Sequence, residues 1–155
     1  MKVLHLISGG DTGGAKTHVH SLLAGLTPRI QVKMVCFTEG PFVEEARALG
    51  IDTQVFPGRN FFANLKQLTQ MVRAEGFDLI HSHGSRGNMM AAFLAKKTGL
   101  PTVSTVHSDY KLDYMGRPFA RLTFGAINAW ALRHLDYRIG VSDAMVDLLI
   151  DRGFP

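Results

Sequence analysis

The sequence predicts an α/β fold built on a doubly wound parallel sheet, and three observations support this prediction. Short apolar runs rich in β-branched residues alternate along the chain with longer segments of helical periodicity. Glycine or proline stands where most of these segments end. The 155 residues are 46% hydrophobic, which suits one globular domain with its own core.

The first half of the chain is expected to contain three strands and three helices in alternation. The strands are expected at residues 2–8, 31–37 and 53–56, and the helices at 15–27, 41–49 and 61–75. Each helical segment places apolar residues at intervals of three and four. Pro28, Gly50 and Gly76 mark the helix ends.

The stretch from Asp78 to Ser108 predicts one strand–helix–strand unit. Strands at 78–82 and 102–106 flank a small-residue helix at 89–97. Parallel strands joined by a helix cross right-handed, so their carboxyl ends meet at one edge of the sheet, where ligands of open α/β sheets bind. The candidate site residues are therefore the polar ones that follow the two strands: His83, Arg86, His107 and Asp109.

The last third of the chain has a different character. Residues 108–118 are polar and aromatic and predict an irregular loop. Residues 119–135 predict a helix that is apolar nearly all round, which is typical of a helix that is buried or touches a partner or a membrane. A strand follows at 137–141, and Ser142 is expected to cap a helix at 143–151.

Composition and charge exclude several classes of protein. The net charge is +4, but the basic residues are scattered, which disfavours a nucleic-acid partner and leaves open a basic edge facing phosphates or anionic lipid. No apolar run reaches the about 18 residues of a membrane span. The single cysteine, Cys36, lies in an apolar run and is expected to be a buried thiol. We expect a cytoplasmic protein without a cleaved signal peptide.

A glycine-rich loop, residues 9–14, joins the first strand to the first helix. Its four glycines let a ligand approach the backbone, and the helix that follows offers free N–H groups to a phosphate or diphosphate. A flexible tight turn is the alternative. The dinucleotide pattern fails because Asp11 and Thr12 replace the middle glycine, and the P-loop pattern fails because Ala15 follows Gly14. NAD and ATP are therefore disfavoured, and no cofactor is expected.

The sequence His81-Ser82-His83 places two histidines on the same face of a strand. With His107 and Asp109 they would make four potential metal ligands. The simpler interpretation is that His81 packs inside and His83 lines the strand end. We favour it, because neither DxD nor HExxH accompanies the pair, and we expect no metal.

His107 begins the loop after the second strand of this unit. A histidine there can orient a hydroxyl, donate to a forming oxyanion, or act as a base near neutral pH. Asp109 could hold its ring. A purely structural role is the alternative.

Four motifs in this order resemble the retaining glycosyltransferases of family 4, which have the GT-B fold. The motifs are GGAKTHV at 13–19, DLIHSH at 78–83, PTVSTVH at 101–107 and DYRIGVS at 136–142. The resemblance covers nearly the whole chain and implies a Rossmann-like domain that is the amino-terminal half of a two-domain enzyme. The carboxy-terminal domain, which grips the nucleotide, is absent from this chain.

The resemblance also implies a function. Such enzymes transfer a sugar from a nucleotide-diphosphate donor with retention and usually without a metal. Residues 108–135 would hold acceptor specificity, and the apolar helix there permits a lipid-linked acceptor as well as a sugar. A lipid-linked acceptor would place the protein in peripheral contact with the inner face of the membrane. Gly13 and Gly14 would meet the donor diphosphate, and His107 would be catalytic beside the reacting sugar. Acceptor binding is expected at Asp11, Lys16, His83, Arg86, Asp109, Tyr110 and Ser142. The family often has Glu where this chain has Lys16, which favours an anionic acceptor.

Two other functions fit the same half-chain. One is a sugar-nucleotide 2-epimerase of the same architecture, although the sequence shows no obvious pair of acid–base carboxylates. The other is a non-catalytic sugar- or nucleotide-binding module. A downstream E-x7-E motif would favour the transferase, and we expect the isolated domain to be inactive.

Overall fold

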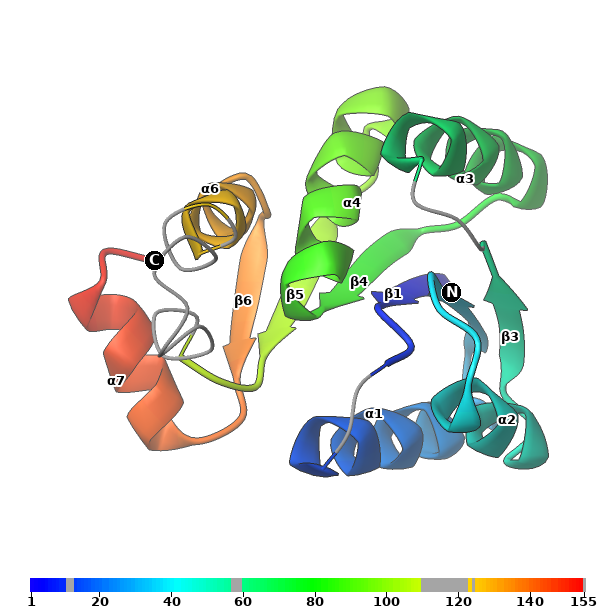
Figure 1. Cartoon of the computed structure of the whole chain (residues 1–155), viewed down its shortest axis with the longest axis horizontal. Helices are drawn as coiled ribbons and strands as arrows, with labels where there is room; N and C mark the ends of the chain where they lie inside the picture. The colour runs from blue at the N-terminus through cyan, green and yellow to red at the C-terminus, as the bar shows by residue number, and fades with distance from the viewer. Residues whose placement is uncertain (11–12, 57–59, 110–122, 124, 155) are drawn as a thin grey trace.

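The computed structural model describes residues 1–10, 13–56, 60–109, 123 and 125–154. Within these residues, strands and helices alternate around a single parallel sheet (Figure 1). The strands are β1 (Lys2–Ile7), β2 (Gln31–Cys36), β3 (Asp52–Val55), β4 (Leu79–His83), β5 (Thr102–Val106) and β6 (Tyr137–Gly140). The helices are α1 (Gly13–Leu26), α2 (Pro41–Ala48), α3 (Phe61–Glu75), α4 (Gly84–Thr98), α6 (Ala126–Arg133) and α7 (Asp143–Asp151).

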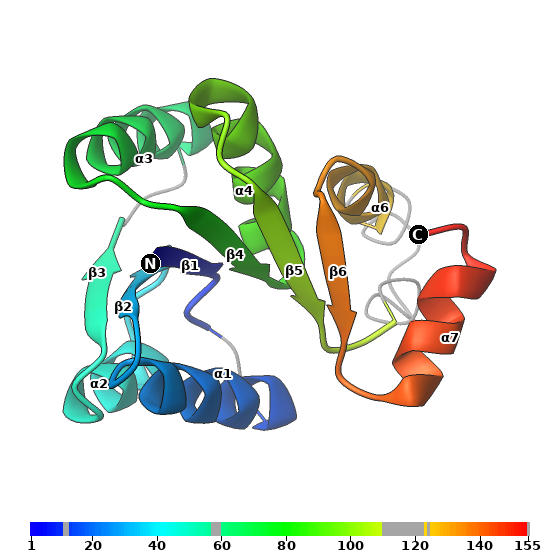
Figure 2. The ribbon, with the colours of Figure 1, turned by 180° about the vertical axis from the view of Figure 1, so that it is seen from behind.

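The strand order is β3-β2-β1-β4-β5-β6, and every neighbouring pair is parallel. The order reverses between β1 and β4, where His5 lies opposite His81 and Leu6 opposite Ser82. Helices α1 and α2 lie on one side of the sheet and α3 and α4 on the other (Figures 1 and 2). The predicted doubly wound, Rossmann-like sheet is therefore confirmed, and β1 and β4 form its switch point.

Two apolar clusters hold the helices to the sheet. The larger is built from the sheet with α3, α4, α6 and α7, and the smaller from the sheet with α1 and α2. Cys36 is buried in the smaller cluster, as expected. Helix α4 approaches β1 so closely that a Cβ atom on Gly87 would lie 2.5 Å from the carbonyl oxygen of Leu6. Only glycine allows this approach, which fixes α4 over the switch point.

A buried polar network ties β4 and β5 to the helices above them. The side-chain oxygen of Asn88 on α4 accepts hydrogen bonds from Ser82 Oγ and Ser104 Oγ, both at 2.7 Å. Its amide nitrogen donates to Asn128 Oδ1 on α6 at 3.0 Å. Because burying an unpaired polar group is costly, the shared partners fix how α4 and α6 sit on these strands.

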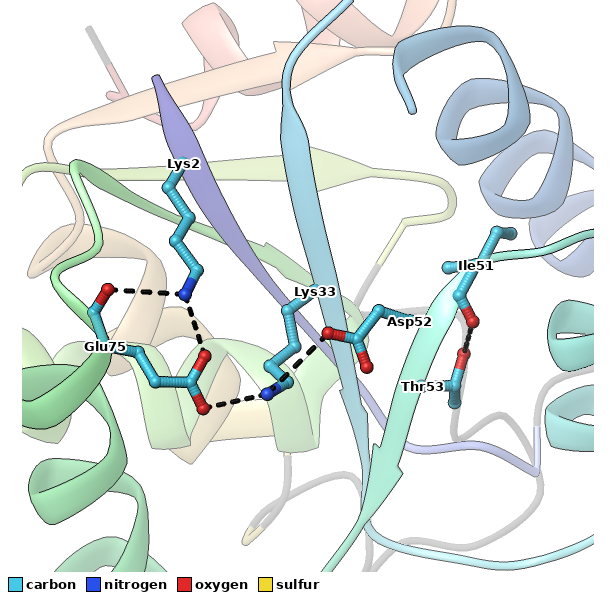
Figure 3. A network of polar contacts seen from close by, with 6 residues as sticks. All are labelled: Lys2, Lys33, Ile51, Asp52, Thr53 and Glu75. Atoms are coloured by element: carbon cyan, nitrogen blue, oxygen red, sulfur yellow. Dashed lines mark hydrogen bonds and ion pairs between the residues drawn. The ribbon is translucent and has the colours of Figure 1, made fainter. Parts of the chain in front are cut away.

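Ion pairs stabilise the edge of the sheet at which the strands begin. Figure 3 shows Glu75, at the end of α3, between Lys2 on β1 and Lys33 on β2, with Nζ–Oε distances of 2.8 Å in both pairs. Asp52 of β3 lies 3.7 Å from the Lys33 amine. The two lysines hold the pKa of Glu75 below its ordinary 4.5. This network lies at the edge opposite to the strand ends discussed below.

Two predicted helices have different limits in the structure. The helix expected at 89–97 begins at Gly84, because Gly84 adopts φ +70° and turns the chain from β4 directly into α4. The polar run at 84–88, which precedes the predicted helix, is the first helical turn. Of the helix expected at 119–135, the structure describes α6 from Ala126, and most of its first part lies outside the described residues.

The other expected elements agree closely with the structure. Helices α3 and α7 have the predicted limits, and Asn60 and Ser142 cap them through side-chain oxygens. Throughout the described residues, no helix is both long and apolar enough to cross a bilayer.

Candidate functional site

A cavity of about 290 Å³ opens at the carboxyl edge of the sheet, beside the switch point. Its walls come from the ends of β1, β4 and β5 and from the first turns of α1 and α4. The described residues that line it are Ile7, Ser8, Ala15, His83, Gly84, Ser85, Arg86, His107 and Ser108. Of the candidates inferred from sequence, the structure therefore brings together His83, Arg86 and His107.

His107 lies half-buried just beyond β5 and lines this cavity. Its Nε2 is 3.3 Å from Nδ1 of His83, the last residue of β4. His18 of α1 packs edge-on against it, with ring centroids 5.0 Å apart. Burial, together with the charge of His18, lowers the pKa of His107 from 6.5 to about 4. The ring is therefore neutral at physiological pH.

Three more buried rings lie behind His107 at the switch point. Nδ1 of His5 is 3.2 Å from Nε2 of His83. His81 stacks on His83 with centroids 4.4 Å apart, and its Nε2 is 2.7 Å from Thr105 Oγ1. His81 is thus packed inside, as favoured from sequence, and its partner is a side-chain hydroxyl. Burial lowers the pKa of all three rings, that of His81 to about 4.

His5, His81 and His83 are also the residues that could hold a metal ion, since one nitrogen from each lies within 4.8 Å of the others. Imidazole is a good ligand for zinc and copper. Both nitrogens of His83 and one nitrogen each of His5 and His81 already meet other groups, however. The ring planes of His81 and His83 are also only 22° apart. Lone pairs lie in the ring plane, so two stacked rings cannot aim theirs at one ion without turning.

Two helices begin at the cavity. Helix α1 starts at Gly13, which has φ +66°, and both Gly13 and Gly14 are exposed with open space where a Cβ would lie. Helix α4 starts at Gly84, and Arg86 in its first turn lines the cavity. Free N–H groups and the positive end of a helix favour an anion. Burial lowers the pKa of Arg86, whose guanidinium lies 5.0 Å from the Phe37 ring.

The remaining sequence candidates lie elsewhere. The Lys16 amine pairs with the Glu45 carboxylate of α2 at 3.0 Å. Asp109 forms a two-pronged ion pair with Arg152, at the end of α7. Ser142 caps α7 by accepting from the Met145 amide at 3.3 Å. Asp11 and Tyr110 lie outside the described residues.

Sequence reasoning missed three contributors to this edge. His5 and His18 gave no signal, because a single histidine in a strand or a helix is ordinary and only tertiary pairing places them near His83 and His107. The second helix start, at Gly84, was hidden by its loop-like composition. A Gly-Ser pair directly after a buried strand was the only available sign.

The sequence and the fold of this chain both resemble those of known proteins. The model of Glycosyltransferase Family 4 matches residues 12–155. No curated protein sequence matches the chain. The fold is similar to that of Anabaena HepE, solved with UDP-glucose, with a TM-score of 0.78 and 20% identity over 100% of this chain and 41% of HepE.

Two further solved structures share the fold. The lipopolysaccharide outer core galactosyltransferase WaaB, in its apo form, has a TM-score of 0.69 and 16% identity over 100% of this chain and 43% of WaaB. A UDP-N-acetylglucosamine 2-epimerase described as putative, from Listeria monocytogenes, has a TM-score of 0.70 and 11% identity over 99% of this chain and 42% of its own.

The chain therefore spans about two fifths of the length of these three structures. At such low identities, structural similarity shows the fold alone. The family model is different in kind, since it matches the sequence itself over nearly its whole length. The chain belongs to Glycosyltransferase Family 4.

Proposed function

We propose that this chain is the acceptor-side domain of a retaining glycosyltransferase that uses a nucleotide-diphosphate sugar. The observation that carries the proposal is the cavity at the switch point, where two helix N-termini, Arg86 and the neutral His107 surround one space. Among the described residues that line it, none is Asp or Glu. Such a cavity suits a ligand that carries both negative charge and hydroxyl groups.

The chemistry asked of this domain is electrostatic. When the bond between the anomeric carbon and the diphosphate breaks, negative charge develops on the departing oxygens. The free amides at Gly13 and Gly14 and the start of α4 are preorganised to stabilise that charge, with Arg86 beside them. His107 would contact the sugar or an oxygen next to it. A second domain would grip the nucleotide.

The acceptor is expected to enter along the same edge. Lys16 was assigned to an anionic acceptor, but its charge is met by Glu45 in the structure. This leaves Arg86 as the cation lining the described part of the cavity. We therefore move the proposed anionic contact from Lys16 to Arg86.

A 2-epimerase remains the second candidate, since the Listeria structure shares the fold. That reaction needs groups that remove and return a proton. The cavity offers histidines whose pKa values are lowered and no carboxylate among its described lining residues. This composition favours the transferase.

The proposal is tested with a protein that joins this chain to a nucleotide-binding second domain. The measurement is sugar transfer by that protein. With labelled UDP-glucose and a panel of sugar and lipid-linked acceptors, we expect a product whose anomeric configuration is that of the donor. Arg86→Ala should weaken transfer at least tenfold, whereas Arg29→Ala, at the opposite edge of the sheet, should not. Interconversion of UDP-N-acetylglucosamine with its C2 epimer, without transfer, would show that the epimerase candidate is right.

A further inference from the structure

The rings of His5, His83 and His107 form a chain joined edge to edge. The nitrogen–nitrogen distances are 3.2 Å between His5 and His83 and 3.3 Å between His83 and His107. The ring planes differ by 14° in the first pair and 35° in the second. Facing ring nitrogens at these distances let an N–H on one ring point at the lone pair of the next. Both nitrogens of His83 are therefore committed to its two neighbours.

Three rings joined in this way can arrange their protons in two ways. A neutral imidazole carries one N–H and one lone pair, so the direction of one hydrogen bond dictates the direction of the next. In the first arrangement every ring carries its proton on Nδ1, and each bond donates from the buried end outwards. In the second every ring carries it on Nε2, and each bond donates inwards. Burial keeps the rings neutral by lowering the pKa of each of them.

The surroundings of His5, at the buried end of the three rings, decide between the two proton arrangements. Nε2 of His5 is fully buried and has no hydrogen-bond partner within the described residues. In the second arrangement it would carry an N–H with no acceptor. In the first it carries only an unused lone pair. Buried N–H groups without a partner are rarer than under-used acceptors, since an unmet donor loses a directed bond that water would have supplied.

We infer that the histidine chain fixes His107 as the tautomer with its proton on Nδ1, which makes His107 a hydrogen-bond donor toward the cavity and not a general base. Its Nε2 lone pair is used by the N–H of His83. Its Nδ1 has no hydrogen-bond partner among the described residues, and the residue lines the cavity. His83 is then a positioning residue, and His5 is the buried terminus that sets the polarity of the chain.

A fixed tautomer decides which role His107 takes, a choice that the sequence left open. A lone histidine at a strand end can orient a hydroxyl, donate to an oxyanion or accept a proton. The tautomer proposed here retains the first two roles and removes the third. The ligand it would serve is an oxygen of a sugar or of a phosphate; that assignment rests on the proposed function, whereas the tautomer follows from the fold.

Nitrogen-15 NMR of the uniformly labelled chain tests the inference, because protonated and bare ring nitrogens resonate far apart. The His107 signals are identified by their loss in His107→Gln. We expect a protonated Nδ1 and a bare Nε2. His83→Phe removes the partner of Nε2, so the two His107 nitrogens should shift toward averaged positions. His81→Phe is the matched control. It removes a ring that stacks on His83 but whose hydrogen bond, within the described residues, goes to Thr105, so the His107 tautomer should persist.

Either of two results overturns the inference. One is a proton on Nε2 of His107 in the unmodified chain, a result that requires His107→Gln only for assigning the signals. The other is a His107 tautomer that stays fixed in His83→Phe. Both leave the proposed transferase standing, while failure to detect sugar transfer would remove that function and leave the measured tautomer unchanged.

Discussion

His83 ends β4 and His107 follows the end of β5, and the two rings meet through a 3.3 Å contact between Nδ1 and Nε2. They are 24 residues apart in sequence, yet adjacent parallel strands bring their carboxyl ends together. The contact links the cavity to the buried histidines of the switch point.

For the proposed transferase, replacing His107 should reduce the rate of sugar transfer more than the affinity for substrate. If the Nδ1 proton serves the transition state, His107→Ala lowers kcat about a hundredfold, roughly 3 kcal/mol, with little change in KM. His107→Asn should retain more activity than His107→Gln, because the Asn amide sits as far from Cβ as Nδ1 does. Steady-state kinetics on the two-domain enzyme measures this.

The matched control for His107 is His134→Ala. His134 is exposed at the end of α6 and bonds a backbone carbonyl of its own helix. The His134→Ala substitution should leave kcat unchanged. A His107→Ala enzyme with near-native kcat but a lowered melting temperature would assign the residue a structural role.

The chain purified without chelator should contain no stoichiometric metal. The nitrogens of His5 and His83 already bond each other, and the stacked rings of His81 and His83 direct their lone pairs along nearly parallel planes. A buried divalent ion would also lack a carboxylate among these three ligands. Elemental analysis checks the prediction. One equivalent of zinc that disappears in His83→Ala would contradict it.

Stability should fall as the pH drops from about 6.5 toward about 4. The buried histidines have native pKa values below 6.5, that of His81 being about 4, so in this window the unfolded chain binds protons that the native chain does not. Each such histidine contributes a slope of up to about 1.4 kcal/mol per pH unit. Urea unfolding across the window measures it. His81→Phe should show a shallower slope, and a flat profile in the parent chain would refute the prediction.

Glu75 should affect stability at lower pH than the histidines do. Hydrogen bonds from Lys2 and Lys33 lower its pKa from 4.5, so its contribution is present above that value and is lost as the pH falls through the native pKa. Glu75→Gln should lower stability at neutral pH by about 1 kcal/mol, because the group is partly exposed. The histidine slope above pH 4.5 should be the same in this variant, which separates the two causes.

Gly87→Ala should destabilise the chain by about 1–3 kcal/mol, the usual effect of overpacking. Its new methyl group would meet the Leu6 carbonyl oxygen at 2.5 Å, and backbone on a central strand cannot move aside cheaply. Gly25→Ala is the control, since nothing lies within 4 Å of a Cβ there and α1 gains a better helix former. Thermal melts that rank Gly87→Ala at or above Gly25→Ala in stability would show that α4 can shift.

The sequence by itself determined the order of elements, the parallel sheet and the edge at which the site lies. Local patterns suffice for these features. Apolar runs and punctuating glycine or proline identify strands and helices, and parallel connectivity sends the carboxyl ends of β4 and β5 to one edge. The start of α7 followed from the cap expected at Ser142, and the end of α3 from Gly76. Membership of the family also rested on short motifs in the right order.

Only the tertiary structure decided which residues meet. Whether His5 lies beside His81 depends on the register of β1 against β4, which no local pattern encodes. Whether Lys16 and Asp109 face a ligand depends on Glu45 and Arg152, which approach them from other helices. The start of α4 depended on the left-handed turn at Gly84, made where the helix packs over β1. Contacts between distant segments are set by packing of the whole core. Those contacts join the rings of His5, His83 and His107 through their nitrogens and leave Nδ1 of His107 toward the cavity.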